Sequence, residues 1–140
     1  MARKPFKKVQ TVSDVRLVVS RWRDSGETIA LVPTMGAIHE GHLSLISKAQ
    51  NMCSRVVASL FVNPTQFGEN EDFQTYPMNE TVDTKILRGA GVDLLFLPSA
   101  DEIYPKGFST SITVSSLTNE LCGAHRPGHF SGVATVVAKL

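Results

Sequence analysis

Residues 29–49 read IALVPTMGAIHEGHLSLISKA, and their pattern is the strongest indication of fold in the chain. Residues 29–32 are an apolar run and indicate a strand at 28–32, and residues 43–49 have the pattern of a helix. Gly36 and Gly41 lie in the turn between them and allow the backbone to approach a ligand closely. Such a turn is a natural anion site, because backbone N–H groups point outward there and the helix dipole adds positive charge. We therefore expect an enzyme that performs phosphate chemistry on a nucleotide.

Two histidines, His39 and His42, lie three residues apart at the mouth of this turn. An imidazole donates to phosphate oxygens and offsets the charge that develops during phosphoryl or nucleotidyl transfer. One alternative is a zinc site with Glu40 as a third ligand, although the spacing is shorter than that of HExxH and neither cysteine is an obvious partner. A capping or surface role is the other alternative. A Walker-type loop is excluded, because GxxxxGK[ST] is absent.

The rest of the chain alternates helix and strand patterns. Ser13 is expected to cap the first helix and Asn79 a later one. Parallel strands joined by right-handed βαβ crossovers follow from this order, with ligands bound beyond the carboxyl ends of the strands, near loops 33–42 and 63–67. The expected elements are helix 13–24, strand 28–32, a helix to Met52, strand 55–62, helix 79–88, strand 92–97, an edge strand at 110–114, a short helix at 116–121 and an apolar helical pattern over 133–140.

The composition is that of one soluble globular domain, with 140 residues, 42% of them hydrophobic and 19% charged. A net charge of +1 gives no reason to expect a nucleic-acid or membrane partner. No apolar run reaches the ~20 residues of a membrane span, and the N-terminus lacks the apolar region of a secretory signal. Cys53 and Cys122 form no CxxC motif, so we expect a cytoplasmic protein.

The two ends of the chain differ in character. Residues 1–10 are polar, and we expect them to be a flexible N-terminus before a single domain over residues 11–140. Val133, Val136, Val137 and Leu140 follow helical spacing, and the chain then stops without a terminating glycine, proline or polar residue. We therefore expect a fragment cut within or just after a helix, with a domain that is incomplete at its C-terminal end.

Six blocks of the chain carry a resemblance to known proteins. The blocks are PTMGAIHEGH at 33–42, FVNPTQF at 61–67, DFQTYP at 72–77, GVDLLF at 91–96, IYP at 103–105 and RPGHFSGVATVV at 126–137. The first block alone resembles the HxGH signature of the nucleotidyltransferase superfamily, and the six blocks in this order resemble the pantothenate synthetase (pantoate–β-alanine ligase) family. The resemblance covers roughly residues 10–140 and implies an α/β fold, with a Rossmann-like parallel sheet, helices on both faces, and truncation before a C-terminal domain.

The resemblance implies an ATP-dependent condensation of pantoate with β-alanine to pantothenate. Pantoyl adenylate is the implied intermediate, AMP and pyrophosphate are released, and Mg²⁺ accompanies ATP. The resemblance also implies a homodimer, and it places a phosphate-binding lysine and a smaller domain in a part of the family's chain beyond these residues. We therefore expect little activity from this chain alone. The alternatives are another HxGH nucleotidyltransferase and a non-catalytic nucleotide-binding module.

The resemblance also assigns roles by motif position. His42 is the designated catalytic histidine, and His39 supports the phosphates. Gln66, together with Asn63 and Met35, is expected to hold pantoate and later β-alanine. The expected ATP-binding residues are Pro33, Thr34, Met35, Gly36, Ala37, Ile38, His39, Glu40, Gly41 and His42.

Physical reasoning agrees with the role of the two amides. Asn63 and Gln66 follow a predicted buried strand, and a neutral amide orients a hydroxy acid without neutralising its carboxylate. An ordinary turn at Asn63-Pro64 is the alternative.

A possible substrate loop contains Tyr76, Arg126 and His129. Arg126 and His129 either contact substrate or order a loop over it, and Tyr76 either does the same or packs the loop. Cys122 stands where many relatives carry Glu, so no direct acidic contact is expected there. No protein side chain is identified as a metal ligand.

Overall fold

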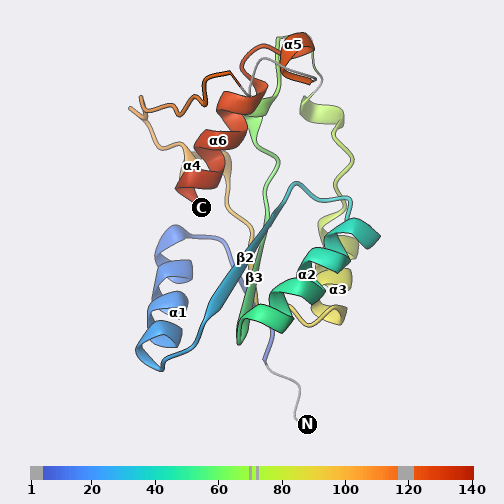
Figure 1. The fold of residues 1–140 in the computed structure, drawn as a ribbon, viewed down its shortest axis with the longest axis vertical. Helices are drawn as coiled ribbons and strands as arrows, with labels where there is room; N and C mark the ends of the chain where they lie inside the picture. The colour runs from blue at the N-terminus through green and yellow to red at the C-terminus, as the bar shows by residue number, and fades with distance from the viewer. Residues whose placement is uncertain (1–4, 70, 72, 117–121) are drawn as a thin grey trace. The chain divides into compact units, whose positions relative to one another are not determined.

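The computed structural model describes residues 5–69, 71, 73–116 and 122–140. The chain divides into two compact units (Figure 1). Unit 1 comprises Met1–Phe61 and Pro77–Ser99, and unit 2 comprises Val62–Tyr76 and Ala100–Leu140. The single domain predicted over residues 11–140 stays a prediction. None of the helices among the described residues is long and apolar enough to span a bilayer.

Unit 1 is built on a parallel sheet with the strand order β1-β4-β3-β2, which confirms the predicted α/β fold class. Three helices connect and cover these strands. The strands are β1 (Lys7–Val9), β2 (Ile29–Thr34), β3 (Arg55–Leu60) and β4 (Leu94–Phe96), and the helices are α1 (Val12–Asp24), α2 (Glu40–Met52) and α3 (Glu80–Gly89).

The strand order explains why helices cover both faces of the sheet. The chain crosses from β1 at one side to β2 at the opposite edge, and it returns through β3 to β4. Because crossovers between parallel strands are right-handed, the outward connection and the two return connections must lie on opposite faces. Figure 1 shows α1 on one side of the sheet and α2 and α3 on the other.

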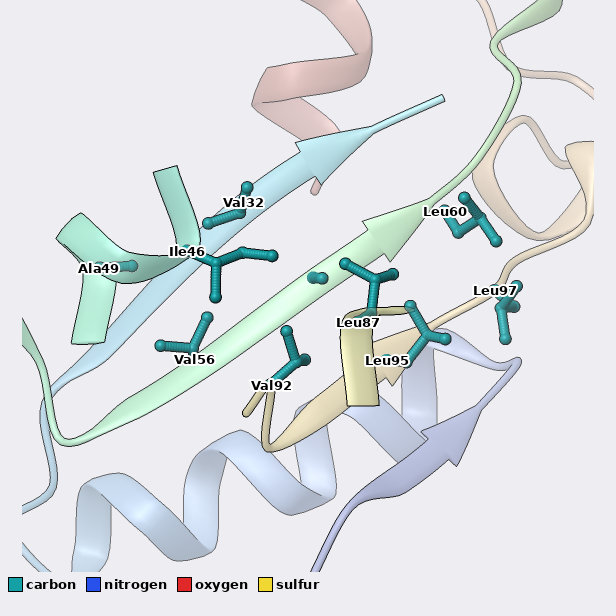
Figure 2. Packing of buried hydrophobic residues seen from close by; sticks show 10 residues of the cluster. Val32, Ile46, Ala49, Val56, Leu60, Leu87, Val92, Leu95 and Leu97 are labelled. Carbon is teal, nitrogen blue, oxygen red and sulfur yellow. The ribbon is translucent and has the colours of Figure 1, made fainter. Parts of the chain in front are cut away.

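The core of unit 1 lies between β3, β4 and the helices α2 and α3 (Figure 2). Val56, Ala58 and Leu60 alternate along β3 and pack in one cluster with Ile46 of α2 and Leu87 of α3. The residues between them on β3 are buried as well. The continuous apolar run of this segment therefore marks a strand covered on both faces, as the sequence indicates.

The helix caps of unit 1 partly follow the prediction. Asn79 caps α3, since its Oδ1 accepts the N–H of Val82 at 3.1 Å. The predicted cap at Ser13 is wrong, because α1 begins at Val12 and Thr11 is its N-cap. Thr11 has the extended backbone of an N-cap residue, and its Oγ1 accepts the N–H of Asp14 at 3.1 Å.

The four strands of unit 1 differ from their predicted extent. Strand β3 ends at Leu60 rather than residue 62, and β4 covers Leu94–Phe96 rather than residues 92–97. Strand β2 continues through Pro33 to Thr34, beyond the predicted end at residue 32. Because β2 is an edge strand, the missing N–H of Pro33 interrupts no ladder between two neighbours. Residues 7–9 form β1 rather than part of a flexible terminus, and Val9 is buried beside β4. Three residues are too few to show a strand period in the sequence.

Unit 2 contains short helices and one longer helix. The predicted edge strand at 110–114 is wrong, since these residues have no regular structure. Ile112 is held instead by α6, because its N–H donates to Thr135 Oγ1 at 2.9 Å and its carbonyl accepts from Ser131 Oγ at 3.0 Å. The elements are η1 (Pro64–Gln66), η2 (Phe73–Thr75), α4 (Ala100–Ile103), α5 (Cys122–His125) and α6 (His129–Lys139).

Helix α6 contains most of the apolar pattern predicted over 133–140, but it begins earlier, at His129. Gly128 precedes it with φ +81°, a left-handed conformation that glycine adopts without strain. Ser116 lies in a turn, and residues 117–121 of the predicted short helix lie outside the described residues.

Candidate functional site

The two motif histidines form a reciprocal cap at the start of α2. His39 is the N-cap residue, and its Nδ1 accepts the N–H of Gly41 at 3.1 Å. The N–H of His39 in turn donates to Nδ1 of His42 at 3.3 Å. The two ring centroids are 4.1 Å apart, with an angle of 48° between the ring planes. The capping role that the sequence left open is therefore real, and it uses one nitrogen of each ring.

This cap determines which nitrogen of each ring is available to a ligand. A ring nitrogen that accepts a hydrogen bond carries no proton, so each neutral histidine holds its proton on Nε2. Both rings then offer an Nε2–H donor while both Nδ1 atoms are engaged. Two such donors on neighbouring rings suit phosphate oxygens.

The pKa of His42 is lowered from its ordinary value of 6.5. Partial burial is the main cause, because it disfavours the imidazolium form, and the charge of His39 acts in the same direction. Asp83 acts in the opposite direction. His42 is therefore neutral at pH 7, as its place in the cap requires.

A pH dependence of stability follows from this lowered pKa. Below pH 6.5 the unfolded chain binds a proton on His42 that the folded chain does not, so stability falls as the pH drops from 6.5 through the folded pKa. We expect the melting temperature of the chain to fall in this window. His42→Gln should show a smaller fall, since glutamine at this third helical position completes a capping box but does not titrate. Equal falls in both chains would show that another group is responsible.

Asp83 of α3 holds the loop between β2 and α2. Its side chain is buried, and its Oδ2 and Oδ1 accept the N–H groups of Ala37 and Ile38 at 3.0 and 2.9 Å. Gly36 has φ +95°, and a Cβ there would lie 2.9 Å from Cγ of Met78 and 3.1 Å from Oδ2 of Asp83. Sequence reasoning missed Asp83. The available signal was a carboxylate on the buried side of a helix, four residues after its cap.

The structure differs from the expectation that the N–H groups of this turn point outward to an anion. Those of Ala37 and Ile38 point to Asp83, and that of Gly36 donates to Thr34 Oγ1 at 3.4 Å. Those of His39 and Gly41 are used in the cap. The groups of this segment that could still bind an anion include the two ring Nε2 atoms and the positive end of the α2 dipole.

The remaining motif residues have varied surroundings. Pro33 is exposed on the edge strand, Glu40 is exposed in the first turn of α2, and Met35 is half-buried. Thr34 is buried, and its Oγ1 donates to the carbonyl of Ser59 at 2.8 Å. It therefore ties β2 to β3, and its predicted contact with ATP stays a prediction.

The geometry does not support the zinc alternative. Among the described residues, no group of three His, Cys, Asp or Glu side chains is placed to hold a metal ion. Nδ1 of each histidine already accepts a backbone N–H.

Asn63 lies at the centre of the hydrogen bonds of unit 2, and its side chain is 1% exposed. Its Nδ2 donates to Gln66 Oε1 at 2.9 Å and to the carbonyl of Gly132 at 3.1 Å. Its Oδ1 accepts from the N–H and Oγ1 of Thr65 at 3.3 and 2.9 Å, and from Tyr104 Oη at 2.8 Å. The amide is thus fully bonded within unit 2. An ordinary turn, the alternative at this position, would not need a side chain that joins so many segments.

Gln66 receives its orientation from this network. Because Oε1 accepts from Asn63, the opposite end of the Gln66 amide is the Nε2 donor. The side chain is only half-buried. Gln66 therefore offers N–H groups to a ligand oxygen, while Asn63 determines which end of its amide is offered.

Arg126 and His129 order the loop that follows η1. Arg126 binds both carboxylate oxygens of Glu71, and its Nη2 donates to the carbonyl of Gln66 at 3.4 Å. His129 donates through Nδ1 to the same carbonyl at 2.8 Å, since a carbonyl oxygen only accepts. The Arg126 hydrogen bonds are the main cause that lowers the pKa of Glu71, followed by the Gly68 N–H. The contacts favour the loop-ordering alternative for both residues.

Aromatic contacts and one close packing contact complete unit 2. Tyr76 packs edge-on against Phe67 with 5.9 Å between ring centroids, which agrees with a packing role in the loop. Gly132 allows α6 to approach η1, because a Cβ there would lie 2.4 Å from the carbonyl oxygen of Thr65. Tyr104 lies in the IYP block and Gly132 in the RPGHFSGVATVV block, but the sequence predicted no role for either residue.

Comparison with known proteins gives consistent results. The model of the family described as Pantoate-beta-alanine ligase matches residues 7–140. The chain is 56% identical over 132 residues to pantothenate synthetase of Paramagnetospirillum magneticum and 58% identical over 131 residues to that of Rhodospirillum rubrum. Each match covers 94% of this chain and 46% of the relative, so the chain spans about half the length of these relatives.

Solved structures give the same result. Pantothenate synthetase from Thermus thermophilus matches with a TM-score of 0.89 and 48% identity, over 96% of this chain and 47% of that chain. The ligase of Francisella tularensis, solved in complex with beta-gamma ATP and beta-alanine, matches with a TM-score of 0.86 and 43% identity, over 96% of this chain and 51% of that one.

Proposed function

Because the chain belongs to the pantoate-beta-alanine ligase family, we propose that its residues act in the ATP-dependent condensation of pantoate with β-alanine. The proposal applies to these residues within a protein of the length of its relatives. The observation that supports it most directly is the histidine pair, which lies inside the matched region with both Nδ1 atoms engaged and both Nε2 atoms left to donate.

The proposed reaction has two steps. A carboxylate oxygen of pantoate attacks the α-phosphorus of ATP, forming pantoyl adenylate as the bond to pyrophosphate breaks. The amine of β-alanine then attacks the acyl carbon, forming the amide of pantothenate and releasing AMP. His42 and His39 donate through Nε2 to phosphate oxygens and stabilise the charge that develops on the leaving pyrophosphate.

Unit 2 provides the contact with pantoate in this proposal. Gln66 donates its Nε2 hydrogens to an oxygen of pantoate and leaves the attacking carboxylate ionised. Asn63 holds Gln66 in position and has no hydrogen-bonding capacity left for the substrate. Met35 is half-buried beside the motif loop and remains a candidate contact for pantoate.

The proposal treats ATP as a substrate, and the Francisella tularensis relative, solved with beta-gamma ATP, supports this choice. Mg²⁺ would arrive with ATP and neutralise phosphate charge. Mg²⁺ of this kind is held by substrate phosphates, water and one or two carboxylates, and we assign it no ligand among the described residues. A cytoplasmic homodimer stays a prediction, and light scattering measures its assembly state.

Pantoate-dependent exchange of pyrophosphate into ATP tests the proposed function. A protein of the relatives' length that carries these residues should catalyse exchange with pantoate and form pantothenate once β-alanine is added. Exchange with a different acceptor would indicate another HxGH nucleotidyltransferase. ATP binding without exchange would indicate a non-catalytic module. The 140-residue chain, assayed beside the longer protein, should form little pantothenate.

A further inference from the structure

Asp83 is a buried ionisable residue of unit 1 that the proposed reaction does not use. Its side chain is 3% exposed, and its two oxygens accept the N–H groups of Ala37 and Ile38. A buried carboxylate is unfavourable unless it is hydrogen-bonded, and bonds from N–H groups to a charged oxygen are stronger than neutral ones. Both bonds go to one loop, so the burial of this charge and the shape of that loop depend on each other.

The loop that Asp83 binds has an unfavourable backbone conformation. Gly36 has φ +95° and Ala37 has φ +52°. A left-handed conformation brings the Cβ of alanine close to the following carbonyl oxygen, so the surroundings must hold it in place. Asp83 holds this conformation by accepting the N–H groups of the two peptide bonds that precede and follow Ala37.

The same loop leads directly into the histidine cap. The Ile38 N–H binds Asp83, and the next residue is His39, whose N–H donates to Nδ1 of His42. A shift of the loop therefore moves His39, loosens the reciprocal cap and releases both rings from their orientation. Catalytic groups that move by about 1 Å lose on the order of 10²-fold in rate.

We propose that Asp83 is a positioning residue, which holds the loop 36–38 so that His39 and His42 direct their Nε2 atoms toward the nucleotide phosphates. This inference rests on the proposed function. The inference adds to the proposed function a residue of α3 that orients the two histidines. This residue contacts the loop and not the substrate.

Asp83→Asn tests the proposal, because it keeps the shape but replaces one acceptor oxygen with a donor that faces a backbone N–H. In a protein of the relatives' length, kcat for pantoate-dependent exchange should fall about 10²-fold while KM for pantoate changes little. Glu80→Gln is the matched control, since it removes the same charge one turn earlier on α3, where Glu80 is exposed and binds Lys8. The control should keep the parent kcat.

A second readout uses the 140-residue chain and needs no catalysis. The NMR titration of the His42 ring should shift in Asp83→Asn, because the variant removes a charge that favours the imidazolium and loosens the cap on which the burial of the ring depends. It should stay in place in Glu80→Gln. A folded Asp83→Asn protein with parent kcat and parent His42 titration would overturn the proposal. Absence of exchange in the parent protein would refute the proposed function, while the titration would still test Asp83.

Hydrogen exchange in the parent chain keeps the proposal testable if Asp83→Asn fails to fold. The amides of Ala37 and Ile38 should exchange far more slowly than those of the exposed segment 109–111, although Ala37 is itself exposed. Equally rapid exchange at both places would show that Asp83 does not hold the loop.

Discussion

Replacement of His42 by alanine should reduce pantoate-dependent ATP–pyrophosphate exchange by about 10²–10³-fold, the usual effect of losing one preorganised donor to a developing negative charge. Pantoate affinity should change little, because the proposed contact of His42 is with phosphate and the proposed contact of pantoate is with Gln66. The measurement determines two quantities for the variant and for the parent, each in a protein of the relatives' length. They are the maximal exchange rate and the pantoate concentration that gives half-maximal exchange. Equal losses in both would remove the special role of His42.

Two control variants separate the chemistry of His42 from its cap. His42→Gln keeps a side chain that reaches back to the His39 N–H, so it should preserve α2 while losing the ring Nε2 donor. Its exchange rate should be nearly as low as that of His42→Ala, but its stability should exceed that of His42→Ala by about 1 kcal/mol. His125→Ala removes an exposed histidine of α5 and should leave exchange unchanged.

Gly132→Ala should destabilise the chain, although alanine favours a helix interior over glycine by about 1 kcal/mol. The new Cβ would lie 2.4 Å from the carbonyl oxygen of Thr65 and 2.9 Å from the nitrogen of Gln66, both backbone atoms that do not move alone. Helix α6 must then move away from η1, which breaks the bond from Asn63 Nδ2 to the Gly132 carbonyl. Overpacking of this kind costs about 1–3 kcal/mol.

Thermal unfolding of the 140-residue chain measures this effect, and we expect the melting temperature to fall by several degrees. Gly89→Ala is the matched control, because Gly89 ends α3 and a Cβ there meets nothing within 4 Å. That variant should be neutral or slightly more stable. A Gly132→Ala chain as stable as Gly89→Ala would show that α6 and η1 do not approach each other as closely as described.

Periodic and local signals account for the parts of the fold that were predicted correctly. Most of the strand predicted at 55–62 forms β3, the segment after Asn79 forms α3, and a helix begins within the HEGH sequence, at Glu40. Strand β1 and the segment 110–114 were predicted incorrectly. β1 has three residues that pair only because β4 is present, and the alternating residues of 110–114 find no strand partner.

In the candidate site, too, some features could be predicted from the sequence and others depend on the fold. The His39–His42 spacing and the position of Gln66 after a strand are visible in the sequence, whereas their partners come from distant segments. Asp83 binds a loop 45 and 46 residues earlier in the chain, and Arg126 binds Glu71 55 residues earlier. An unaligned sequence contains no local pattern that connects such residues.

The sequence alone therefore established the α/β class, the strand–turn–helix motif and the histidine pair, because each depends on residues within a few positions of one another. Tertiary structure set the hydrogen-bond partners of individual atoms. It engaged Nδ1 of both histidines in a cap and turned two loop N–H groups toward Asp83. It also saturated the amide of Asn63, so that of these two amides only that of Gln66 keeps its donor end available. Buried polar groups must find partners wherever the folded chain brings them, and those partners are set by packing rather than by spacing along the sequence.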